Sequence, residues 1–430
     1  MTVLVLLLAN LLFPAGVLIV LAQFVFSPRR RILLGVGCEL RERLGFLSVQ
    51  QVQKLAGKPV IWAHAASAGE AAAVSGLLEK ILALKPDHAV LMTCSTAAGR
   101  QAARQLPFID VASMAPLDFF PTVNHFLRFF RPAALIIVET ELWPHMIEMN
   151  ARRGAKLCLV NGRLTERSFS RYRPFAPLVK PFLRKMNRVI VQTQRDRERF
   201  LALGADPDSL AVCGNMKYDL SKPAPQSPQI QQAIEKLGWD GLPLIVAGST
   251  HPVEEQAVID AFLEARRACA QVKLVIAPRH VERAAQTAAT LQNNSVKFAS
   301  WSKPLDGEDY AALLIDAMGI LPSFYSHAKI SFVGGTLVPV GGHNLLEPAL
   351  AGSPVAFGPY VSHTHETAAA LKKSGGGFQV DDKNELARVI KEILADSEKA
   401  REASAHARQA ARSLQGATER TLAQLADILK

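Results

Sequence analysis

Short apolar runs alternate with helix-like stretches through most of this 430-residue chain. In the first half the runs are 60–64, 89–93, 134–138, 156–160 and 188–192, and in the second half they are 244–247, 272–277, 313–316, 330–334 and 354–357. Strands that are separated by helices pair in parallel, and the helices then cover both faces of the sheet. The alternation therefore predicts two α/β domains, each built on a parallel sheet.

The domain limits follow from composition and length. Segment 221–243 starts rich in Pro and Gln, continues as a helix-like stretch and is broken again before the next apolar run, so we predict a linker there. It separates an N-terminal domain, 29–220, from a C-terminal domain, 244–395. The last stretch, 396–430, is rich in Ala, Arg, Glu and Leu and predicts terminal helices. A chain of this length is expected to form two or three domains.

The N-terminal stretch predicts a membrane anchor over residues 1–28. Residues 2–26 carry no charged side chain, and Arg29 to Arg31 follow at once. An uncharged stretch of this length is enough to cross a hydrocarbon core as a helix. The positive-inside tendency places the C-terminal side in the cytoplasm. A cleaved signal peptide is disfavoured because no basic residue precedes the apolar stretch. A bent helix that lies in one leaflet remains open, since Pro14 and Gly16 stand near the middle.

The charge is concentrated in one segment. Residues 152–199 contain 14 Lys and Arg against three acidic residues, which accounts for the whole net charge of +11. Such a block can face nucleic acid, an anionic membrane or an acidic substrate, or it can be a solvated surface. No aromatic-interleaved motif of an RNA-binding module accompanies it, so we expect no nucleic acid partner. The five cysteines are scattered, which disfavours both a disulfide framework and a zinc site.

Polar side chains in the first domain stand where the apolar runs end. Glu70 closes the small-residue loop HAASAGE after run 60–64, and Glu139 and Glu141 begin ETELWP after run 134–138. Lys217 lies in GNMKYD. Open parallel sheets bind ligands at the carboxyl ends of their strands, where a carboxylate can act as a general base and a lysine can meet a developing anion. The alternative for Glu70 is an acidic residue in the first turn of a helix, favoured by the helix dipole.

The second domain carries a glycine-rich loop, GGTLVPVGGHNLLEP, over residues 334–348. Its glycines permit positive φ and close approach to a ligand, and the helix that begins near Asn344 and Glu347 offers backbone N–H groups to a phosphate or carboxylate. The same pair also fits a capping box. Arg279 ends another run, and its guanidinium suits phosphate. No GxGxxG follows the first run of either domain, which disfavours a dinucleotide oxidoreductase.

Two further patterns were considered as metal sites and disfavoured. His363 and His365 stand two residues apart in a predicted loop, and Asp206 and Asp208 flank a proline in a predicted turn.

Six motifs in order resemble one family over nearly the whole chain: HAASAGE, ETELWP, GNMKYD, APRH, GGTLVPVGGHNLLEP and the apolar N-terminus. They are similar to the 3-deoxy-D-manno-octulosonic acid (Kdo) transferases of lipopolysaccharide and lipid A biosynthesis. The resemblance implies a GT-B glycosyltransferase, with two Rossmann-like domains that face each other across a cleft. The first would bind the acceptor and the second the nucleotide-sugar. It further implies the donor CMP-Kdo, a lipid A precursor (lipid IVA) as acceptor, an inverting reaction at the cytoplasmic side of the inner membrane, and no cofactor or catalytic metal.

The resemblance also implies roles for particular residues. Glu70 would take the proton of the acceptor hydroxyl, while Lys217 and either Glu139 or Glu141 would support the transition state. The residues implied in CMP binding are Pro278, Arg279, Met318, Gly319, Ile320, Asn344, Leu345, Leu346 and Glu347.

Two positions depart from the family's pattern. Ile320 stands where a Glu usually follows Met-Gly, which puts that side-chain contact in doubt, and Ala68 stands where Val is common. Two alternatives stay open at this stage: a GT-B enzyme that uses a UDP-sugar, and a membrane-anchored nucleotide-binding protein without catalysis.

Overall fold

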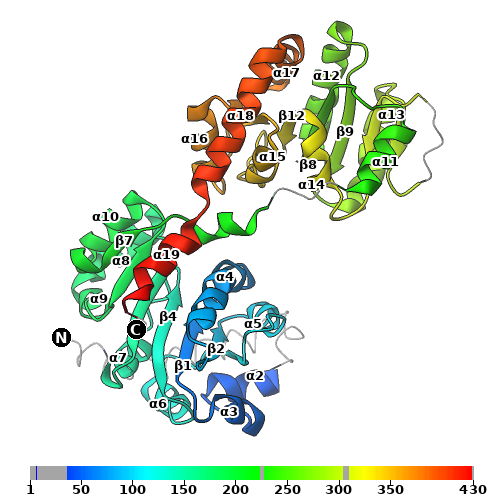
Figure 1. The fold of residues 1–430 in the computed structure, drawn as a ribbon. Helices are drawn as coiled ribbons and strands as arrows, with labels where there is room; N and C mark the ends of the chain where they lie inside the picture. Colours follow the sequence, from blue (N-terminus) through cyan, green and yellow to red (C-terminus); the bar gives the residue numbers. More distant parts are fainter. Residues whose placement is uncertain (1–5, 7–35, 223–226, 304–308, 429–430) are drawn as a thin grey trace, which may run out of the picture. The chain divides into compact units, whose positions relative to one another are not determined.

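Two seven-stranded parallel sheets organise the computed structural model (Figure 1). The structure describes residues 6, 36–222, 227–303 and 309–428. The chain divides into two units, one up to Leu220 together with the segment from Gln415 onward, and one from Ser221 to Leu414. The predicted parallel α/β architecture is confirmed in each unit.

The first sheet has the strand order β3-β2-β1-β4-β5-β6-β7. Its strands are β1 (Val60–His64), β2 (Ala89–Cys94), β3 (Val111–Met114), β4 (Pro132–Val138), β5 (Lys156–Gly162), β6 (Arg188–Val191) and β7 (Leu210–Val212). The helices of this unit are α2 (Val36–Arg43), α3 (Val49–Leu55), α4 (Ala68–Leu84), α5 (Ala97–Arg104), α6 (Phe120–Phe126), α7 (Pro144–Arg152), α8 (Glu166–Tyr172), α9 (Ala176–Leu183), α10 (Gln194–Ala202) and α19 (Ala417–Ala426).

The second sheet has the order β10-β11-β9-β8-β12-β13-β14. Its strands are β8 (Leu244–Thr250), β9 (Lys273–Pro278), β10 (Phe298–Ser300), β11 (Ala312–Leu314), β12 (Ala328–Val333), β13 (Val355–Phe357) and β14 (Gly377–Gln379). The helices are α11 (Pro228–Lys236), α12 (Pro252–Ala268), α13 (Ala284–Asn293), α14 (Leu321–Phe324), α15 (Leu346–Ala351), α16 (His365–Ser374), α17 (Lys383–Ala395) and α18 (Ser397–Leu414).

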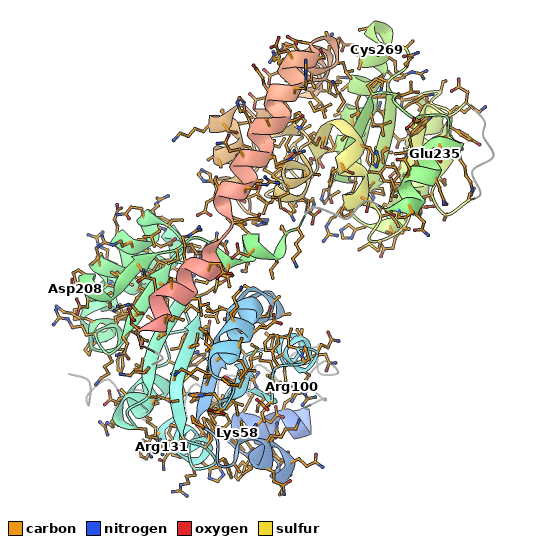
Figure 2. The ribbon with its side chains drawn as sticks, viewed as in Figure 1. Lys58, Arg100, Arg131, Asp208, Glu235 and Cys269 are labelled. Carbon is orange, nitrogen blue, oxygen red and sulfur yellow. The ribbon has the colours of Figure 1, made fainter. Side chains whose placement is uncertain are left out.

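The apolar runs are continuous because each sheet is packed on both faces. Figure 2 draws the side chains on the ribbon. In β1, Val60 and Trp62 belong to one hydrophobic core while Ile61 and Ala63 belong to another. The second sheet likewise separates two cores. Neighbouring residues of a strand point to opposite faces, so a strand buried on both sides needs apolar residues at every position.

The segment predicted as a linker, 221–243, forms part of the second unit. It contains helix α11, and Ile230, Ile234 and Trp239 are buried in a core of that unit. The apolar spacing of this helix gives it a face that must pack, so the segment beyond its Pro-rich start is not a free connection.

The predicted terminal helices, 396–430, do not form one block. Helix α18 belongs to the second unit, whereas α19 belongs to the first, where Leu425 is buried. The Asp219 carboxylate holds the start of α19 in the first unit, because it accepts hydrogen bonds from the N–H groups of Gly416 and Thr418, both at 2.6 Å. Asp219, the last residue of the GNMKYD motif, therefore serves the fold by holding the start of α19.

The predicted anchor, 1–28, lies outside the described residues apart from Leu6. Within the described ranges, none of the helices is both long enough and apolar enough to cross a membrane.

Candidate active site

The strand order of the first sheet reverses between β1 and β4. The chain builds β1, β2 and β3 outward on one side and β4 to β7 on the other. The loops that leave the carboxyl ends of β1 and β4 therefore run to opposite sides and leave a crevice between them, which is where open α/β sheets bind ligands. Glu70 lies on the loop and helix after β1, and Glu139 and Glu141 lie on the loop after β4. The topology thus places the three predicted carboxylates at one point of the sheet.

Glu70 is held by the loop that it follows. Its Oε2 accepts from the backbone N–H of Ala66 at 2.8 Å, and its Oε1 accepts from the Ser67 hydroxyl at 2.9 Å. Ser67 is the N-cap of α4, and its hydroxyl in turn accepts from the Glu70 N–H at 3.4 Å. Burial raises the pKa of Glu70, and the negative charges of Glu139 and Glu141 raise it further. The carboxylate is thus both fixed in place and made more basic.

Glu139 forms an ion pair with Lys217, with Nζ 2.6 Å from Oε1. Its backbone has a φ of 61°, a region that non-glycine residues seldom adopt. The Glu139 N–H still donates to Val160 O at 2.9 Å, so the strained residue is held at the end of the strand. Strain of this kind at a strand end is typical of sites that position a functional side chain.

Glu141 is held in a different way. Its Oε2 accepts from the indole Nε1 of Trp143 at 3.0 Å and lies 3.8 Å from Nε2 of His64. The nearby His64 imidazole lowers the pKa of Glu141. Glu70 and Glu141 therefore have pKa values pushed in opposite directions, which is the arrangement that lets one carboxyl exchange a proton while another stays ionised.

The second sheet has the same kind of reversal between β8 and β12. The glycine-rich loop leaves β12 there, and its backbone has the form that the sequence predicts. Gly335 and Gly341 have φ values of 70° and 105°. A Cβ on Gly334 would lie 2.2 Å from Ser249 O, so only glycine permits this approach to β8.

Glu254, in the first turn of α12, holds the glycine-rich loop. Its fully buried carboxylate accepts four backbone N–H groups: those of His251 at 3.0 Å, Gly335 at 2.7 Å, Thr336 at 2.9 Å and Leu337 at 2.8 Å. One charged side chain thereby joins the loop after β8 to the loop after β12. These four backbone donors are therefore satisfied within the protein and are not available to a ligand.

A group of imidazoles lies next to this loop. The Nε2 atoms of His251 and His343 are 2.9 Å apart, and the two rings stack at 5.2 Å. Burial, together with the neighbouring His251 and Arg279, lowers the pKa of His343 to about 4. The Arg279 charge is thus close enough to be felt by the pair. The two histidines share one hydrogen bond between neutral rings, beside a guanidinium that can receive an anion.

Asn344 and Glu347 begin α15 in a way that differs from a capping box. Asn344 Oδ1 accepts from the N–H of Leu346 at 3.0 Å, and its Nδ2 donates to Glu347 Oε1 at 3.0 Å. Asn344 therefore caps the helix start, but Glu347 returns to the Asn344 side chain rather than to a backbone N–H. Leu345 and Leu346 are buried, so only their backbone groups can meet a ligand.

The other predicted nucleotide contacts follow strands of the same sheet. Pro278 is the last residue of β9, and Arg279 follows it with its N–H bonded to Thr250 O at 3.0 Å. Met318 and Gly319 follow β11, with Met318 75% exposed and Gly319 at a φ of 79°. Ile320 is the N-cap residue of the short helix α14 and has no side-chain capping bond. The strand order puts all of these at the carboxyl edge.

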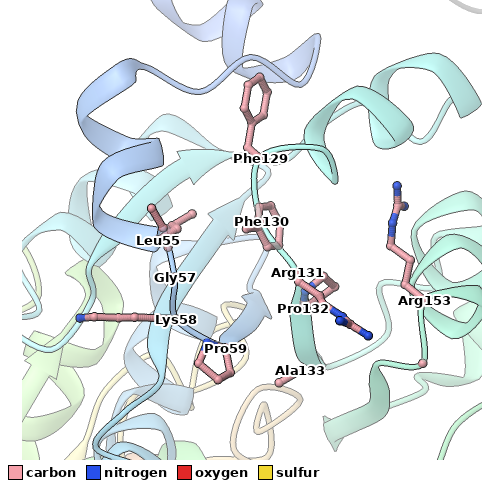
Figure 3. A pocket seen from close by; sticks show the side chains of 12 residues that line it. Leu55, Gly57, Lys58, Pro59, Phe129, Phe130, Arg131, Pro132, Ala133 and Arg153 are labelled. Atoms are coloured by element: carbon pink, nitrogen blue, oxygen red, sulfur yellow. The ribbon is translucent and has the colours of Figure 1, made fainter.

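A cavity among the described residues lies at the opposite edge of the first sheet (Figure 3). It has a volume of about 550 Å³ and is lined by the ends of helices and by Phe130, Lys58, Arg131 and Arg153, of which Lys58 and Arg131 also carry labels in Figure 2. Helices α3 and α7 end here, and cations are favoured beside the free carbonyl groups of helix C-termini. The predicted site residues lie at the carboxyl edge of the sheet, away from this cavity.

No three His, Cys, Asp or Glu side chains of the described part of the chain are arranged to hold a metal ion. Asp206 instead caps a turn, in which its carboxylate accepts from the N–H of Asp208 at 3.1 Å.

Comparisons with known proteins decide the family. Residues 38–220, which end where the first unit ends, match the family model of 3-deoxy-D-manno-octulosonic-acid transferase (kdotransferase). The chain is 32% identical to the 3-deoxy-D-manno-octulosonic acid transferase of Aquifex aeolicus, over 78% of this chain and 86% of the relative. It is 31% identical to the enzyme of the same name from Chlamydia muridarum, over 82% of each chain.

The chain belongs to the 3-deoxy-D-manno-octulosonic acid transferase family. The resemblance stated from the sequence motifs is thereby confirmed. Among solved structures, a glycosyltransferase from Rickettsia africae has a TM-score of 0.57 with 13% identity, over 87% of this chain and 99% of that one. This likeness shows that the fold is GT-B-like.

The sequence interpretation missed the contacts made by Glu254 and by the buried pair His64 and Thr93. Glu254 stands three residues after His251, at the spacing of a capping-box glutamate, so its place at a helix start was readable. Its hydrogen bonds to a loop more than 80 residues further along the chain could not be predicted from this spacing. His64 opens the HAASAGE motif, but a buried histidine at the end of an apolar strand usually serves packing, and Thr93 carries no local signal.

Proposed function

We propose that this protein transfers Kdo from CMP-Kdo to a lipid A precursor with inversion at the anomeric carbon, as a step of lipopolysaccharide biosynthesis. The identity of the transferred group, Kdo, rests on the family to which the chain belongs. The observation that carries the mechanism is the state of Glu70: a carboxylate at the switch point of the first sheet, with both oxygens held and its pKa raised by burial. A raised pKa brings a carboxylate closer to the basicity that proton abstraction at neutral pH requires.

In the proposed step, Glu70 removes the proton of the acceptor hydroxyl while that oxygen bonds to the anomeric carbon. The bond from this carbon to the phosphate oxygen breaks on the opposite side, and CMP leaves with the electron pair. Such a displacement inverts the configuration and needs no covalent enzyme intermediate. We assign to the Lys217–Glu139 pair, joined at 2.6 Å, the task of keeping a positive charge near the charge that develops.

For the donor we propose the carboxyl edge of the second sheet. Arg279 provides a guanidinium for the phosphate, and Asn344 and Glu347 provide polar groups beside the buried Leu345 and Leu346. Burial raises the pKa of Glu347, which favours a role as a hydrogen-bond partner of hydroxyl groups. The Ile320 departure removes one polar contact that relatives of this pattern would have. We further propose that the two units face each other across a cleft, since the base and the donor must reach the same anomeric carbon.

For localisation we propose the cytoplasmic side of the inner membrane. The uncharged stretch 2–26 with the arginines that follow supports an anchor. The basic segment 152–199 supports contact with an anionic surface, since Arg167, Arg171 and Arg173 are exposed next to Phe175, whose side chain is 58% exposed.

The purified full-length chain should be incubated with CMP-Kdo and a lipid A precursor, and the product mass measured. We expect an increase of one or more Kdo residues, with parallel reactions containing UDP-sugars giving none. An unchanged acceptor with CMP-Kdo, or transfer from a UDP-sugar, would contradict the proposal. The same spectrum reports how many Kdo residues are added.

A further inference from the structure

We propose that His64 is a positioning residue of the active site, which acts by holding the Glu141 carboxylate ionised and in place beside the base Glu70. This inference rests on the proposed function for its catalytic meaning. Its physical core is a line of contacts that joins strands β1 and β2 to the loop after β4.

The line begins inside the core. The indole Nε1 of Trp62 donates to Thr93 Oγ1 at 2.8 Å, and the same oxygen lies 3.1 Å from Nδ1 of His64. Trp62 and His64 are alternate residues of β1 and so lie on one face of the sheet, while Thr93 is the register partner of His64 on β2. All three side chains are fully buried.

The Nε2–H tautomer of His64 fits this line of contacts. Thr93 Oγ1 accepts from Trp62 and donates its own hydrogen to Nδ1 of His64. Neutral His64 then carries its proton on Nε2, the atom that faces Glu141 Oε2 at 3.8 Å. Nε2 is buried and has no hydrogen-bond partner among the described residues, so its N–H dipole is directed at the carboxylate alone.

The second support for Glu141 comes from Trp143, whose Nε1 donates to the same Oε2 at 3.0 Å. The rings of His64 and Trp143 meet edge to face at 6.2 Å. The Trp143 N–H thus fixes one carboxylate oxygen by a hydrogen bond, and Nε2 of His64 lies near the same oxygen without bonding to it.

The charged groups around these acids are few. Glu70 faces Glu139 and Glu141, both of which raise its pKa, and Lys217 is bound to Glu139. Burial raises the pKa of the neighbouring Cys94 thiol to about 12, so this group stays neutral.

On the other side, the hydroxyl of Tyr172 feels the Glu141 charge, but burial is the main cause that raises the pKa of Tyr172. Loss of the His64 contact is therefore expected to change the pKa of Glu141 directly and that of Glu70 only through the charge of Glu141.

The first test does not depend on transfer. The protein has four tryptophans, so its indole ¹H–¹⁵N signals are few and each can be assigned by a Trp→Phe change. The Trp143 signal reports protonation of Glu141, to which it is bonded. We expect its titration midpoint to move to higher pH in His64→Phe and to return toward the native value in His64→Gln, whose amide can replace Nε2–H. An unmoved midpoint in His64→Phe, with the Trp62 signal and the melting temperature preserved, would overturn the inference.

The second test is a double-mutant cycle on kcat. His64→Phe should lower kcat about tenfold in the native background, with little change in KM, and have no further effect in Glu141→Gln. Equal losses in both backgrounds would show that His64 serves the fold alone. Should His64→Phe not fold, Trp143→Phe enters the same cycle with the same expectation. Absence of transfer by the native chain would instead refute the proposed function, while the indole titration still decides the role of His64.

Discussion

Replacing Glu254 with Gln tests how the glycine-rich loop is held. Each carboxylate oxygen accepts two backbone N–H groups: Oε1 those of Thr336 and Leu337, and Oε2 those of Gly335 and His251. The amide introduced by Glu254→Gln would keep one acceptor oxygen and place an NH₂ group against two N–H donors. Hydrogen bonds to charged groups contribute about 1.5–3 kcal/mol each, so losing two costs about 3–6 kcal/mol.

A loss of this size is a large part of the stability of a typical domain, which is about 5–15 kcal/mol. For a unit of about 150–250 residues it corresponds to a fall in melting temperature of roughly 6–24 °C. Scanning calorimetry of the full-length protein should show this fall in the transition of the second unit. Isothermal titration with CMP should show weaker binding, because the loop loses its tie to α12.

Glu255→Gln is the matched control. Glu255 is the next residue on α12, equally buried, and its carboxylate pairs with Arg283 at 3.2 Å. Burial raises the pKa of Glu255, so the neutral amide is tolerated better there than at Glu254. We expect a smaller fall in melting temperature and unchanged CMP affinity. Equal effects of the two substitutions, or a Glu254→Gln protein as stable as the native one, would refute the reasoning.

Three further predictions concern the donor, the base and the membrane. Arg279→Ala should weaken CMP binding by about 1.5–3 kcal/mol, the value of a charge-assisted contact, and unchanged calorimetric affinity would count against the donor site. The transfer rate should fall as pH decreases through the raised pKa of Glu70, because only the carboxylate accepts a proton; a rate that stays constant down to the ordinary Glu value of 4.5 would contradict this. Deleting residues 1–26 should release the protein from membranes only in part, since segment 152–199 still attracts anionic lipid, and complete solubility at low salt would disprove that role.

The sequence predicted the central strands well and the edge strands poorly. Runs such as 60–64 and 134–138 coincide with β1 and most of β4, because strands buried on both faces need continuous apolar residues. The strands that it missed, β3, β7, β10 and β14, are the outer strands of the two sheets. They are only three or four residues long, which is too short to show a clear apolar run or alternation.

The positions of the candidate site residues could be predicted, but their contacts could not. Glu70, Glu139 and Glu141 could be predicted because parallel strands deliver the residues that follow them to one edge. The contacts that set their properties could not, since they join residues far apart in the chain: Lys217 to Glu139, His64 to Glu141, and Glu254 to Gly335. Local patterns report where a side chain stands along an element, while partners across the sheet depend on the packed fold.

The central claim is that Glu70 removes the proton of the acceptor, and one comparison tests it directly. Steady-state transfer should be measured for Glu70→Gln and for Glu79→Gln, which changes an exposed glutamate on the same helix, α4. We predict that Glu70→Gln lowers kcat about 10²–10⁴-fold while CMP affinity is retained, and that Glu79→Gln behaves as the native protein. A Glu70→Gln enzyme that transfers Kdo at the native rate would contradict the mechanism.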